Sequence, residues 1–126
     1  MILDRCRNKD EFEKFFNSHP MNDGIMSIDF IYHNPCTYYF YGEEDKNLKG
    51  YISVYTDETF KLFLCGASAR KNMAENINAI ITVCNAFNDD MYSDTDKREA
   101  KICLLKAGFQ KINDTLYVRY KNGKRQ

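Results

Sequence analysis

The spacing of apolar positions divides the chain into three segments with different predicted structures. Residues 1–6 form a short apolar start that predicts a strand. Phe12, Phe15 and Phe16 follow at the i, i+3, i+4 spacing of one helix face, and Asn8 with a Glu three residues later has the form of a capping box. A His-Pro pair ends this helix, because the residue before a proline avoids the helical conformation. The first segment is therefore predicted to be a strand followed by a helix.

The second segment has the composition of strands. It opens with residues 25–32, an apolar run whose structure the pattern leaves open, and Asn34-Pro35 then predicts a turn. Three stretches rich in aromatic, aliphatic and β-branched residues follow, and we expect an antiparallel meander from residues 37–41, 48–56 and 60–65. Residues 66–72 are small and polar and predict a loop.

The third segment alternates helices with short strands. An apolar stripe with a period of 3.6 residues predicts a helix, and it consists of Met73, Ile77, Ile80, Ile81, Cys84 and Phe87. Met91 and Tyr92 suit a very short strand. Residues 109–112 and 115–120 flank an Asn-Asp turn and predict an antiparallel pair.

A last helix lies between the short strand and this pair. Asp96 with Glu99 has the form of a second capping box, and Gly108 supplies the C-terminal stop. The predicted buried face consists of Ala100, Cys103, Leu104 and Ala107. Because the cap, the apolar face and the stop agree, this helix defines the C-terminal third of the fold.

Composition narrows the class of protein. The chain has 126 residues, 44% hydrophobic and 29% charged, which predicts one globular domain over residues 1–126. Lys and Arg total 18, as do Asp and Glu, so no net charge attracts nucleic acid. We expect a soluble, intracellular protein with no membrane segment, because no apolar run approaches ~20 residues and the N-terminus does not resemble a signal peptide. Five widely spaced cysteines without a CxxC pattern predict free thiols.

Two further clusters have simple explanations. His33 and Cys36 lie three residues apart, but no second pair has ligand spacing, so we expect a turn and no metal. Residues 38–41 are consecutive aromatics, and Tyr51 and Tyr55 lie on the next strand. Acidic residues rather than Lys or Arg follow them, which favours a protein interface or a partly exposed sheet face over a platform for bases.

The order of elements resembles the N-acetyltransferase superfamily called GNAT. In that family the last helix carries an Asn, an Ala and a Tyr and closes with a Gly-Phe pair. Here Ala100 precedes Gly108-Phe109 at the family's spacing. The resemblance implies an α/β, GNAT-like fold, with a mixed, mostly antiparallel sheet, two splayed parallel central strands and helices on both faces.

GNAT enzymes bind the pyrophosphate of acyl-CoA with a loop of the form Arg/Gln-x-x-Gly-x-Gly/Ala at the start of a helix. Its glycines let backbone N–H groups approach phosphate oxygens. The resemblance places Arg70 at the first position of this pattern, Met73 at the first glycine and Glu75 at the second. A side chain at Met73 crowds the approach, and the carboxylate of Glu75 repels a pyrophosphate. The acyl-CoA site is therefore expected to be degenerate.

The catalytic positions depart from the family as well. The Tyr that protonates the leaving thiolate of CoA falls on Leu104, which has no proton to give, and the Asn near the start of that helix falls on Lys97. The central strand 60–65 offers no carboxylate as a general base. The weak candidates for catalysis are Tyr55 and Glu58, and both also fit an ordinary surface or turn position.

Two classes of function follow. The combination resembles small phage-encoded GNAT-like proteins, some of which are packaged in the virion, and this implies a non-catalytic structural or interaction module with a protein partner. The alternative is an active N-acetyltransferase that moves an acetyl group from acetyl-CoA to an amine. In that case the resemblance implies cofactor contacts from Leu64, Cys65, Gly66, Arg70, Lys71, Asn72 and Ala74.

Overall fold

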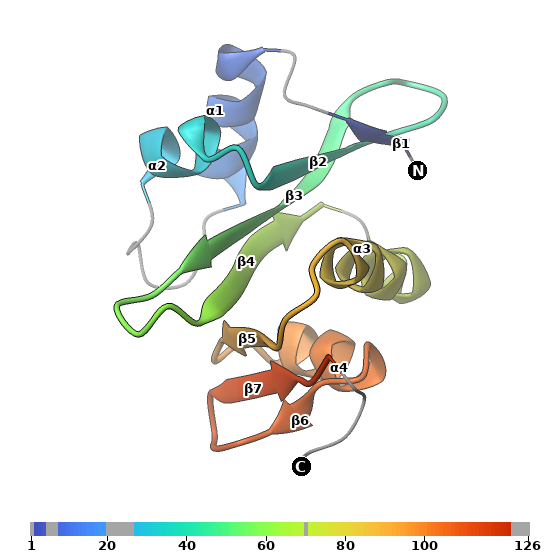
Figure 1. The fold of residues 1–126 in the computed structure, drawn as a ribbon. Coiled ribbons are helices and arrows are strands. Elements are labelled where there is room, and N and C mark those ends of the chain that lie inside the picture. Colours follow the sequence, from blue (N-terminus) through green and yellow to red (C-terminus); the bar gives the residue numbers. More distant parts are fainter. Residues whose placement is uncertain (1, 5–7, 20–26, 70, 122–126) are drawn as a thin grey trace. The chain divides into compact units, whose positions relative to one another are not determined.

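The computed structural model describes residues 2–4, 8–19, 27–69 and 71–121, and Figure 1 shows their fold. The helices of this part of the chain are α1 (Lys9–Ser18), α2 (Ile28–His33), α3 (Met73–Asn85) and α4 (Arg98–Lys106). Its strands are β1 (Ile2–Asp4), β2 (Thr37–Tyr41), β3 (Leu48–Thr56), β4 (Leu62–Ser68), β5 (Met91–Asp94), β6 (Gln110–Lys111) and β7 (Leu116–Arg119). Neighbouring strands follow the order β1-β2-β3-β4-β5-β7-β6.

Contacts group the chain into two compact units. Unit 1 consists of Met1–Ser53 and Gly66–Lys71, and unit 2 consists of Val54–Cys65 and Asn72–Gln126. Strands β3 and β4 each contribute residues to both units, and each unit has its own buried side chains. A single domain over residues 1–126 stays a prediction.

Unit 1 has an aromatic core beneath α1 and α2. Strands β1, β2 and β3 are antiparallel neighbours. Phe12 of α1 is fully buried, and its ring meets those of Tyr39 and Tyr51 edge-on, with centroids 5.5 and 5.3 Å apart. The buried cluster consists of Phe12, Phe15, Ile31, Tyr39, Tyr41, Leu48 and Tyr51. The prediction that the aromatic run on β2 is an interface or a partly exposed face is therefore wrong for Tyr39, Phe40 and Tyr41, which are all buried. Tyr39 and Tyr41 belong to the cluster that also contains residues of α1 and α2.

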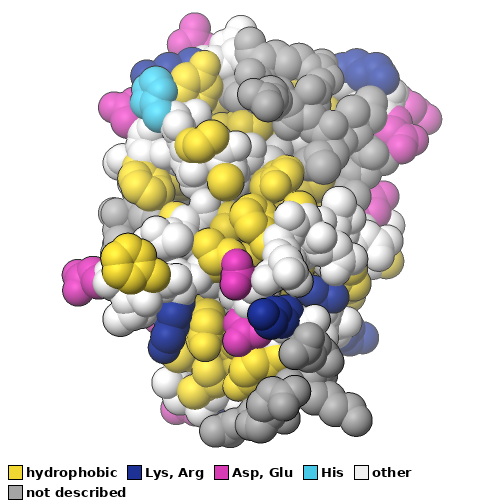
Figure 2. All heavy atoms as spheres, in the orientation of Figure 1, with side chains coloured by type: hydrophobic (Ala, Val, Ile, Leu, Met, Phe, Trp, Pro, Cys, Tyr) yellow, Lys and Arg dark blue, Asp and Glu magenta, His cyan; other side chains and the backbone are white. Residues whose placement is uncertain are grey.

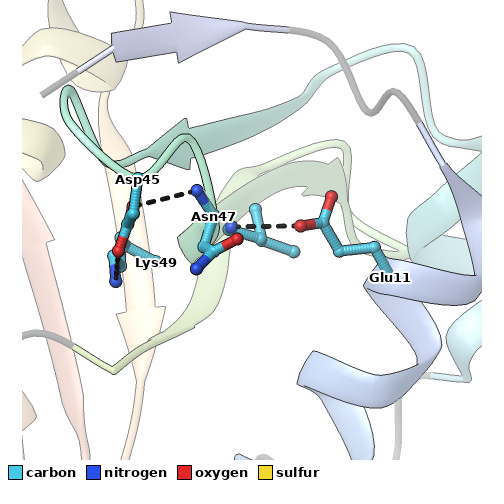
Figure 3. Close-up of polar contacts among 5 residues, drawn as sticks. Glu11, Asp45, Asn47 and Lys49 are labelled. Atoms are coloured by element: carbon cyan, nitrogen blue, oxygen red, sulfur yellow. Dashed lines mark hydrogen bonds and ion pairs between the residues drawn. The ribbon is translucent and has the colours of Figure 1, made fainter.

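Helix α1 begins as the sequence predicts, but its capping glutamate has another role. The side chain of Asn8 accepts hydrogen bonds from the backbone N–H groups of Asp10 and Glu11, at 2.8 and 3.3 Å. The carboxylate of Glu11 accepts from the N–H of Leu48 at 3.3 Å (Figure 3). This bond joins the first turn of α1 to the start of β3 across 37 residues of sequence.

The apolar run 25–32, whose structure the sequence pattern leaves open, is helical from Ile28 onward; residues 25 and 26 lie outside the described part. Ser27 caps α2, and its hydroxyl accepts a hydrogen bond from the N–H of Phe30 at 3.0 Å. Ile31 is fully buried. A serine cap and one buried apolar residue are enough for this short helix because the core supplies its partners.

Strand β4 begins and ends later than predicted. Lys61 belongs to the turn, and the strand continues through Gly66 to Ser68, inside the predicted loop. At Gly66 the backbone of β3 is so close that an added Cβ would lie 2.2 Å from the carbonyl oxygen of Tyr51. Gly66 therefore does not end β4, although the sequence predicted that it would. Its missing side chain lets the backbones of β3 and β4 approach each other closely.

Unit 2 contains α3, α4 and the remaining strands. Strand β5 is parallel to β4 and antiparallel to β7, and β7 is antiparallel to β6. Ala79, Val83 and Cys84 are the buried residues of α3, whereas Met73 at its start is exposed. The buried face of α3 is therefore centred on Ala79, Val83 and Cys84, of which only Cys84 belongs to the predicted stripe. Ile77, Ile80 and Ile81 of that stripe are partly buried.

Helix α4 confirms its predicted face and stop but not its predicted cap. Gly108 has φ +97°, and the N–H of Phe109 donates to the carbonyl of Leu104 at 3.0 Å, as in a Schellman motif. The N-cap residue is Lys97, whose side chain makes no capping hydrogen bond, so the capping box from Asp96 is wrong. Thr95 lies before this turn, and its hydroxyl accepts from the N–H of Lys97 at 3.2 Å.

Candidate functional site

Strands β4 and β5 are a parallel pair that separates soon after it forms. Leu62 is paired with Met91 and Phe63 with Tyr92, and the residue pairing stops there although both strands continue. The buried hydroxyl of Ser93 donates to the carbonyl of Leu64 at 3.2 Å. The predicted splay of two parallel strands is confirmed, and the Leu64 carbonyl already has a hydrogen-bond donor within unit 2.

The N-terminus of α3 follows β4 and carries the residues that the resemblance places at the glycine loop. Asn72 is the N-cap, and its side-chain oxygen accepts a hydrogen bond from the N–H of Glu75 at 3.3 Å. Glu75 is the acidic residue of the first turn. Met73 and Ala74 are both exposed. This helix end thus has one N–H bonded to an amide side chain and a carboxylate in its first turn.

The remaining predicted cofactor contacts lie in different parts of the chain. Cys65 is partly buried in the unit 2 portion of β4. Gly66 and Lys71 belong to unit 1, and Lys71 is exposed. Arg70 lies outside the described residues. Contacts of these residues with acyl-CoA stay predictions.

Leu104 is part of the hydrophobic interior of unit 2. Its side chain is 3% exposed, and its neighbour Cys103 is also buried. Lys97, which the resemblance places at the family's Asn position, is the N-cap residue of α4 and is exposed. Helix α4 therefore has an apolar residue and a cation at the two positions where the resemblance predicts a proton donor and an amide.

The two catalytic candidates occupy the hairpin between β3 and β4. Glu58 is exposed in the turn, whereas Tyr55 is partly buried on β3. The ring of Tyr55 stacks on that of Phe63, with centroids 5.9 Å apart. The next ring, Tyr92 on β5, lies 5.5 Å from Phe63, and the ammonium of Lys61 is 5.3 Å from the centroid of Tyr92. Tyr55 thus belongs to a row of three aromatic rings, which the sequence pattern did not reveal because the rings come from three separate strands.

Cys84 and Asp57, both in unit 2, have shifted pKa values with clear causes. Burial raises the pKa of the Cys84 thiol to about 11, although the nearby Arg119 guanidinium acts in the opposite direction. Burial also acts to raise the pKa of Asp57, but N–H and hydroxyl donors from Lys61 and Thr59 outweigh it and lower the pKa below its usual value. Neither group is poised to exchange a proton near pH 7.

Other kinds of site find little support in the described residues. Within them, no group of three His, Cys, Asp or Glu side chains is arranged to hold a metal ion. No helix of the same residues is long and apolar enough to cross a membrane. Cys36, Cys65, Cys84 and Cys103 are free thiols, as predicted.

Comparisons with known proteins identify the fold. No protein-family model matches the sequence, and no curated protein matches it. An N-acetyltransferase from Staphylococcus aureus Mu50 has a similar structure, with a TM-score of 0.68, 11% identity and coverage of 97% of this chain and 99% of that chain. An aminoglycoside 6'-acetyltransferase type Ii gives a TM-score of 0.67, 14% identity and coverage of 96% and 97%. The chain therefore has the N-acetyltransferase (GNAT) fold that the order of its elements predicts.

Proposed function

We propose that this protein uses the N-acetyltransferase fold as a catalytically silent interaction module. The observation that carries the proposal is the N-terminus of α3, where the side chain of Asn72 bonds the N–H of Glu75 and the Glu75 carboxylate lies in the first turn. An acyl-CoA enzyme of this fold needs that helix end for a pyrophosphate. Here the same end is occupied by the protein's own amide and acid.

The electrostatic effect of Glu75 is large enough to decide binding. A helix N-terminus attracts an anion with about half a unit of positive charge. A full negative charge about 5 Å from a phosphate opposes this attraction by roughly 3 kcal/mol at an effective dielectric constant of about 20. That energy corresponds to more than a hundredfold loss of affinity, before any crowding by Met73 is counted.

Leu104 and Ser93, which also belong to unit 2, support the proposal of a silent module. Leu104 is buried and apolar, so the position of the family's proton donor has no group that can protonate a thiolate. Ser93 donates to the carbonyl of Leu64, one of the residues that the resemblance implies as cofactor contacts. Both features favour a packed interior over an open cofactor site.

The competing proposal is acetyl transfer from acetyl-CoA to an amine. It is favoured by the parallel pair β4 and β5, whose pairing stops after Phe63 and Tyr92. In that case the cofactor contacts come from Leu64, Cys65, Gly66, Arg70, Lys71, Asn72 and Ala74. An acid other than the family's Tyr then protonates the leaving thiolate of CoA. Tyr55 and Glu58 are the candidates for proton transfer.

Acetyl-CoA titration separates the two proposals. A site with a dissociation constant near 10 μM would stabilise the protein by about 2.7 kcal/mol at 1 mM ligand. We expect no such shift for the wild-type protein and no heat of binding in calorimetry. A rise in melting temperature that saturates with acetyl-CoA would reject the silent module.

A matched pair of variants tests the cause. Glu75→Gln removes the carboxylate from the first turn of α3, and Glu99→Gln removes the equivalent charge from the first turn of α4. Only Glu75→Gln is expected to gain measurable affinity for acetyl-CoA. An equal response of both variants would show that the position of the Glu75 charge is not what excludes the cofactor.

The proposed setting of the module is a phage particle, where its partner is another protein. Its support is the likeness to small phage-encoded GNAT-like proteins that lack the glycine loop and the Tyr. Mass spectrometry of purified particles from an infected host tests this part separately. The chain should be present in stoichiometric amounts, and its absence would reject the virion role while leaving the silent site in place.

A further inference from the structure

Three aromatic side chains form a row across neighbouring strands of unit 2. Tyr55 of β3 stacks on Phe63 of β4, with ring centroids 5.9 Å apart and 21° between the ring planes. Phe63 is paired with Tyr92 of β5, and their centroids are 5.5 Å apart, with 31° between the planes. All three side chains are partly exposed. We call these three residues the aromatic row.

The aromatic row lies on the sheet face opposite to the helices of unit 2. Met91 precedes Tyr92 and therefore points to the other face, where it is 1% exposed. Its partner on β7 is Arg119, which donates to the carbonyl of Ala107 at the end of α4, at 3.0 Å, and lies near Cys84 of α3. Helices α3 and α4 thus cover the Met91 face, and Tyr92 points away from them.

The turn beside the aromatic row supplies charged groups. The ammonium of Lys61 is 5.3 Å from the centroid of Tyr92. The carboxylate of Asp57 is used within the turn, where it accepts from the N–H groups of Thr59 and Lys61 at 3.0 and 2.9 Å. Glu58 is exposed at the tip and leaves an acidic group for a partner. Figure 2 shows a face on which apolar side chains reach the surface between acidic and basic groups.

The same turn holds Phe60 in an unfavourable backbone conformation. Phe60 has φ +64° and is 87% exposed, whereas left-handed backbone suits glycine and asparagine. Packing does not offset this strain, because the ring is exposed. Strained residues of this kind cluster at functional sites, which favours a binding role for this hairpin.

We propose that the aromatic row binds a proline-rich segment of another protein, in the polyproline II conformation and with a basic residue at one end. Strands β3, β4 and β5 are consecutive in the sheet order, so the row offers a sheet face and no strand edge to which a β-strand could be added. Polyproline II rises about 3.1 Å per residue, which places alternate residues about 6.2 Å apart. The ring separations of 5.5 and 5.9 Å are close to this spacing, so pyrrolidine rings can lie against successive aromatic rings.

The polar groups beside the row fit the same partner. The hydroxyls of Tyr55 and Tyr92 and the ammonium of Lys61 are able to donate hydrogen bonds. Polyproline II has no internal hydrogen bonds and leaves its carbonyls to accept them, whereas the carbonyls of a helix are already bonded. Glu58 then pairs with an Arg or Lys that flanks the prolines. A single-stranded nucleic acid would need several cations, and Lys61 is the one cation of residues 55–63.

This inference rests on the proposed function as an interaction module and names the chemistry of its partner. The aromatic row does not include α3, so Glu75→Gln should leave peptide binding unchanged. Loss of the two proposals is therefore distinguishable. Saturable acetyl-CoA binding rejects the silent site but not the peptide site, whereas a chain that binds neither ligand rejects the proline-rich partner alone.

Nuclear magnetic resonance titration of the full, isotope-labelled chain tests the proposal, with a hexaproline peptide that carries one flanking arginine as probe. We expect saturable shifts of the amide signals of residues 55–63 and 91–92 and a dissociation constant below about 1 mM, since small interfaces are weak. A glycine-serine peptide with the same arginine should produce none. An oligosaccharide or an amphipathic helical peptide that shifts these signals at lower concentration than the proline peptide would overturn the proposal.

A matched pair of variants tests the role of the rings. Tyr92→Leu keeps an apolar contact but loses ring stacking, and it should weaken peptide binding roughly two- to tenfold. Phe30→Leu changes an exposed aromatic residue of α2 and should leave the affinity unchanged. Melting temperatures show whether each variant is folded. Equal affinities of a folded Tyr92→Leu variant and the wild type would overturn the proposal.

Charge exchange at the turn adds a second readout that does not disturb the row. Because Glu58 is exposed, Glu58→Lys should melt like the wild type. It should weaken binding of the arginine-flanked peptide and strengthen binding of a hexaproline peptide flanked by glutamate. The proposal is overturned if the wild-type chain gives no saturable shift at several millimolar peptide, or if Glu58→Lys leaves the preference between the two peptides unchanged.

Discussion

Substitution of Gly66 by alanine tests whether the close approach of β3 and β4 is a structural requirement. An added Cβ would lie 2.2 Å from the carbonyl oxygen of Tyr51, and real Cβ atoms essentially never come nearer than 3.0 Å. The two backbones must therefore separate by about 0.8 Å, the difference between these distances. The oxygen belongs to β3, which is also paired with β2 at Tyr39, so it cannot move without disturbing a second strand.

The cost follows from these contacts. Forcing one extra carbon into a packed site costs roughly 1–3 kcal/mol, and weakening a backbone hydrogen bond adds about 1 kcal/mol. Alanine restricts the unfolded chain and returns about 0.4–1 kcal/mol. The net destabilisation should be about 1–3.6 kcal/mol, which lowers the melting temperature by roughly 4–14 °C in a chain of this size.

Gly42 supplies a matched control. A Cβ there would lie 2.3 Å from a carboxylate oxygen of Asp45, almost the same distance, but this oxygen is the end of an exposed side chain. Asp45 can turn away at the loss of two exposed contacts, the hydrogen bond that the N–H of Asn47 donates to the same oxygen at 3.0 Å and the ion pair with Lys49, each worth about 1 kcal/mol or less (Figure 3). Alanine again restricts the unfolded chain and returns about 0.4–1 kcal/mol, so Gly42→Ala should change the free energy of unfolding by about 1 kcal/mol or less.

Urea denaturation followed by circular dichroism measures both variants on the same scale. The midpoint of Gly66→Ala should fall well below that of the wild type, with an unchanged slope, while Gly42→Ala stays close to the wild type. Equal effects of the two substitutions, or a neutral Gly66→Ala, would refute the reasoning, because backbone and side-chain obstacles would then be equivalent.

Three further outcomes follow from buried groups. Phe12→Ala should cost about 3–5 kcal/mol in chemical denaturation, because the fully buried ring is central to the core of unit 1. Ser93→Ala should cost about 1 kcal/mol in the same assay, since it removes a buried hydrogen bond to the carbonyl of Leu64. The pKa of Cys84 is raised in the folded state to about 11 from a usual value near 9, so its contribution is complete below about pH 9 and is lost as the pH rises toward 11. Unfolding free energies measured across this range should decline less steeply in Cys84→Ala than in the wild type.

Local sequence signals predicted those elements whose determinants are themselves local. The cap at Asn8 and the stop at Gly108 were readable because each depends on a few adjacent residues, and the structure confirms both. The cap at Asp96 was wrong although its pattern is the same, because the helix begins one residue later than a box from that position requires. A capping pattern indicates that a helix can begin nearby, but it does not determine which of several neighbouring residues is the N-cap.

Features that depend on distant segments were not predictable. Strand β4 extends beyond Gly66 because Tyr51 lies opposite, and Tyr39 and Tyr41 of β2 are buried because they pack in one cluster with Phe12 and Phe15 of α1. The row of rings containing Tyr55 comes from three strands and has no sequence motif. In the candidate site, the sequence predicted which residue types depart from the family, whereas the bond from Asn72 to Glu75 needed the structure.

The central claim is that the fold no longer binds acyl-CoA, and isothermal titration calorimetry with acetyl-CoA tests it most directly. The account predicts no binding heat for the wild-type chain at millimolar ligand and a measurable affinity once Glu75 is replaced by glutamine. A wild-type dissociation constant in the micromolar range would contradict the account and favour the active N-acetyltransferase.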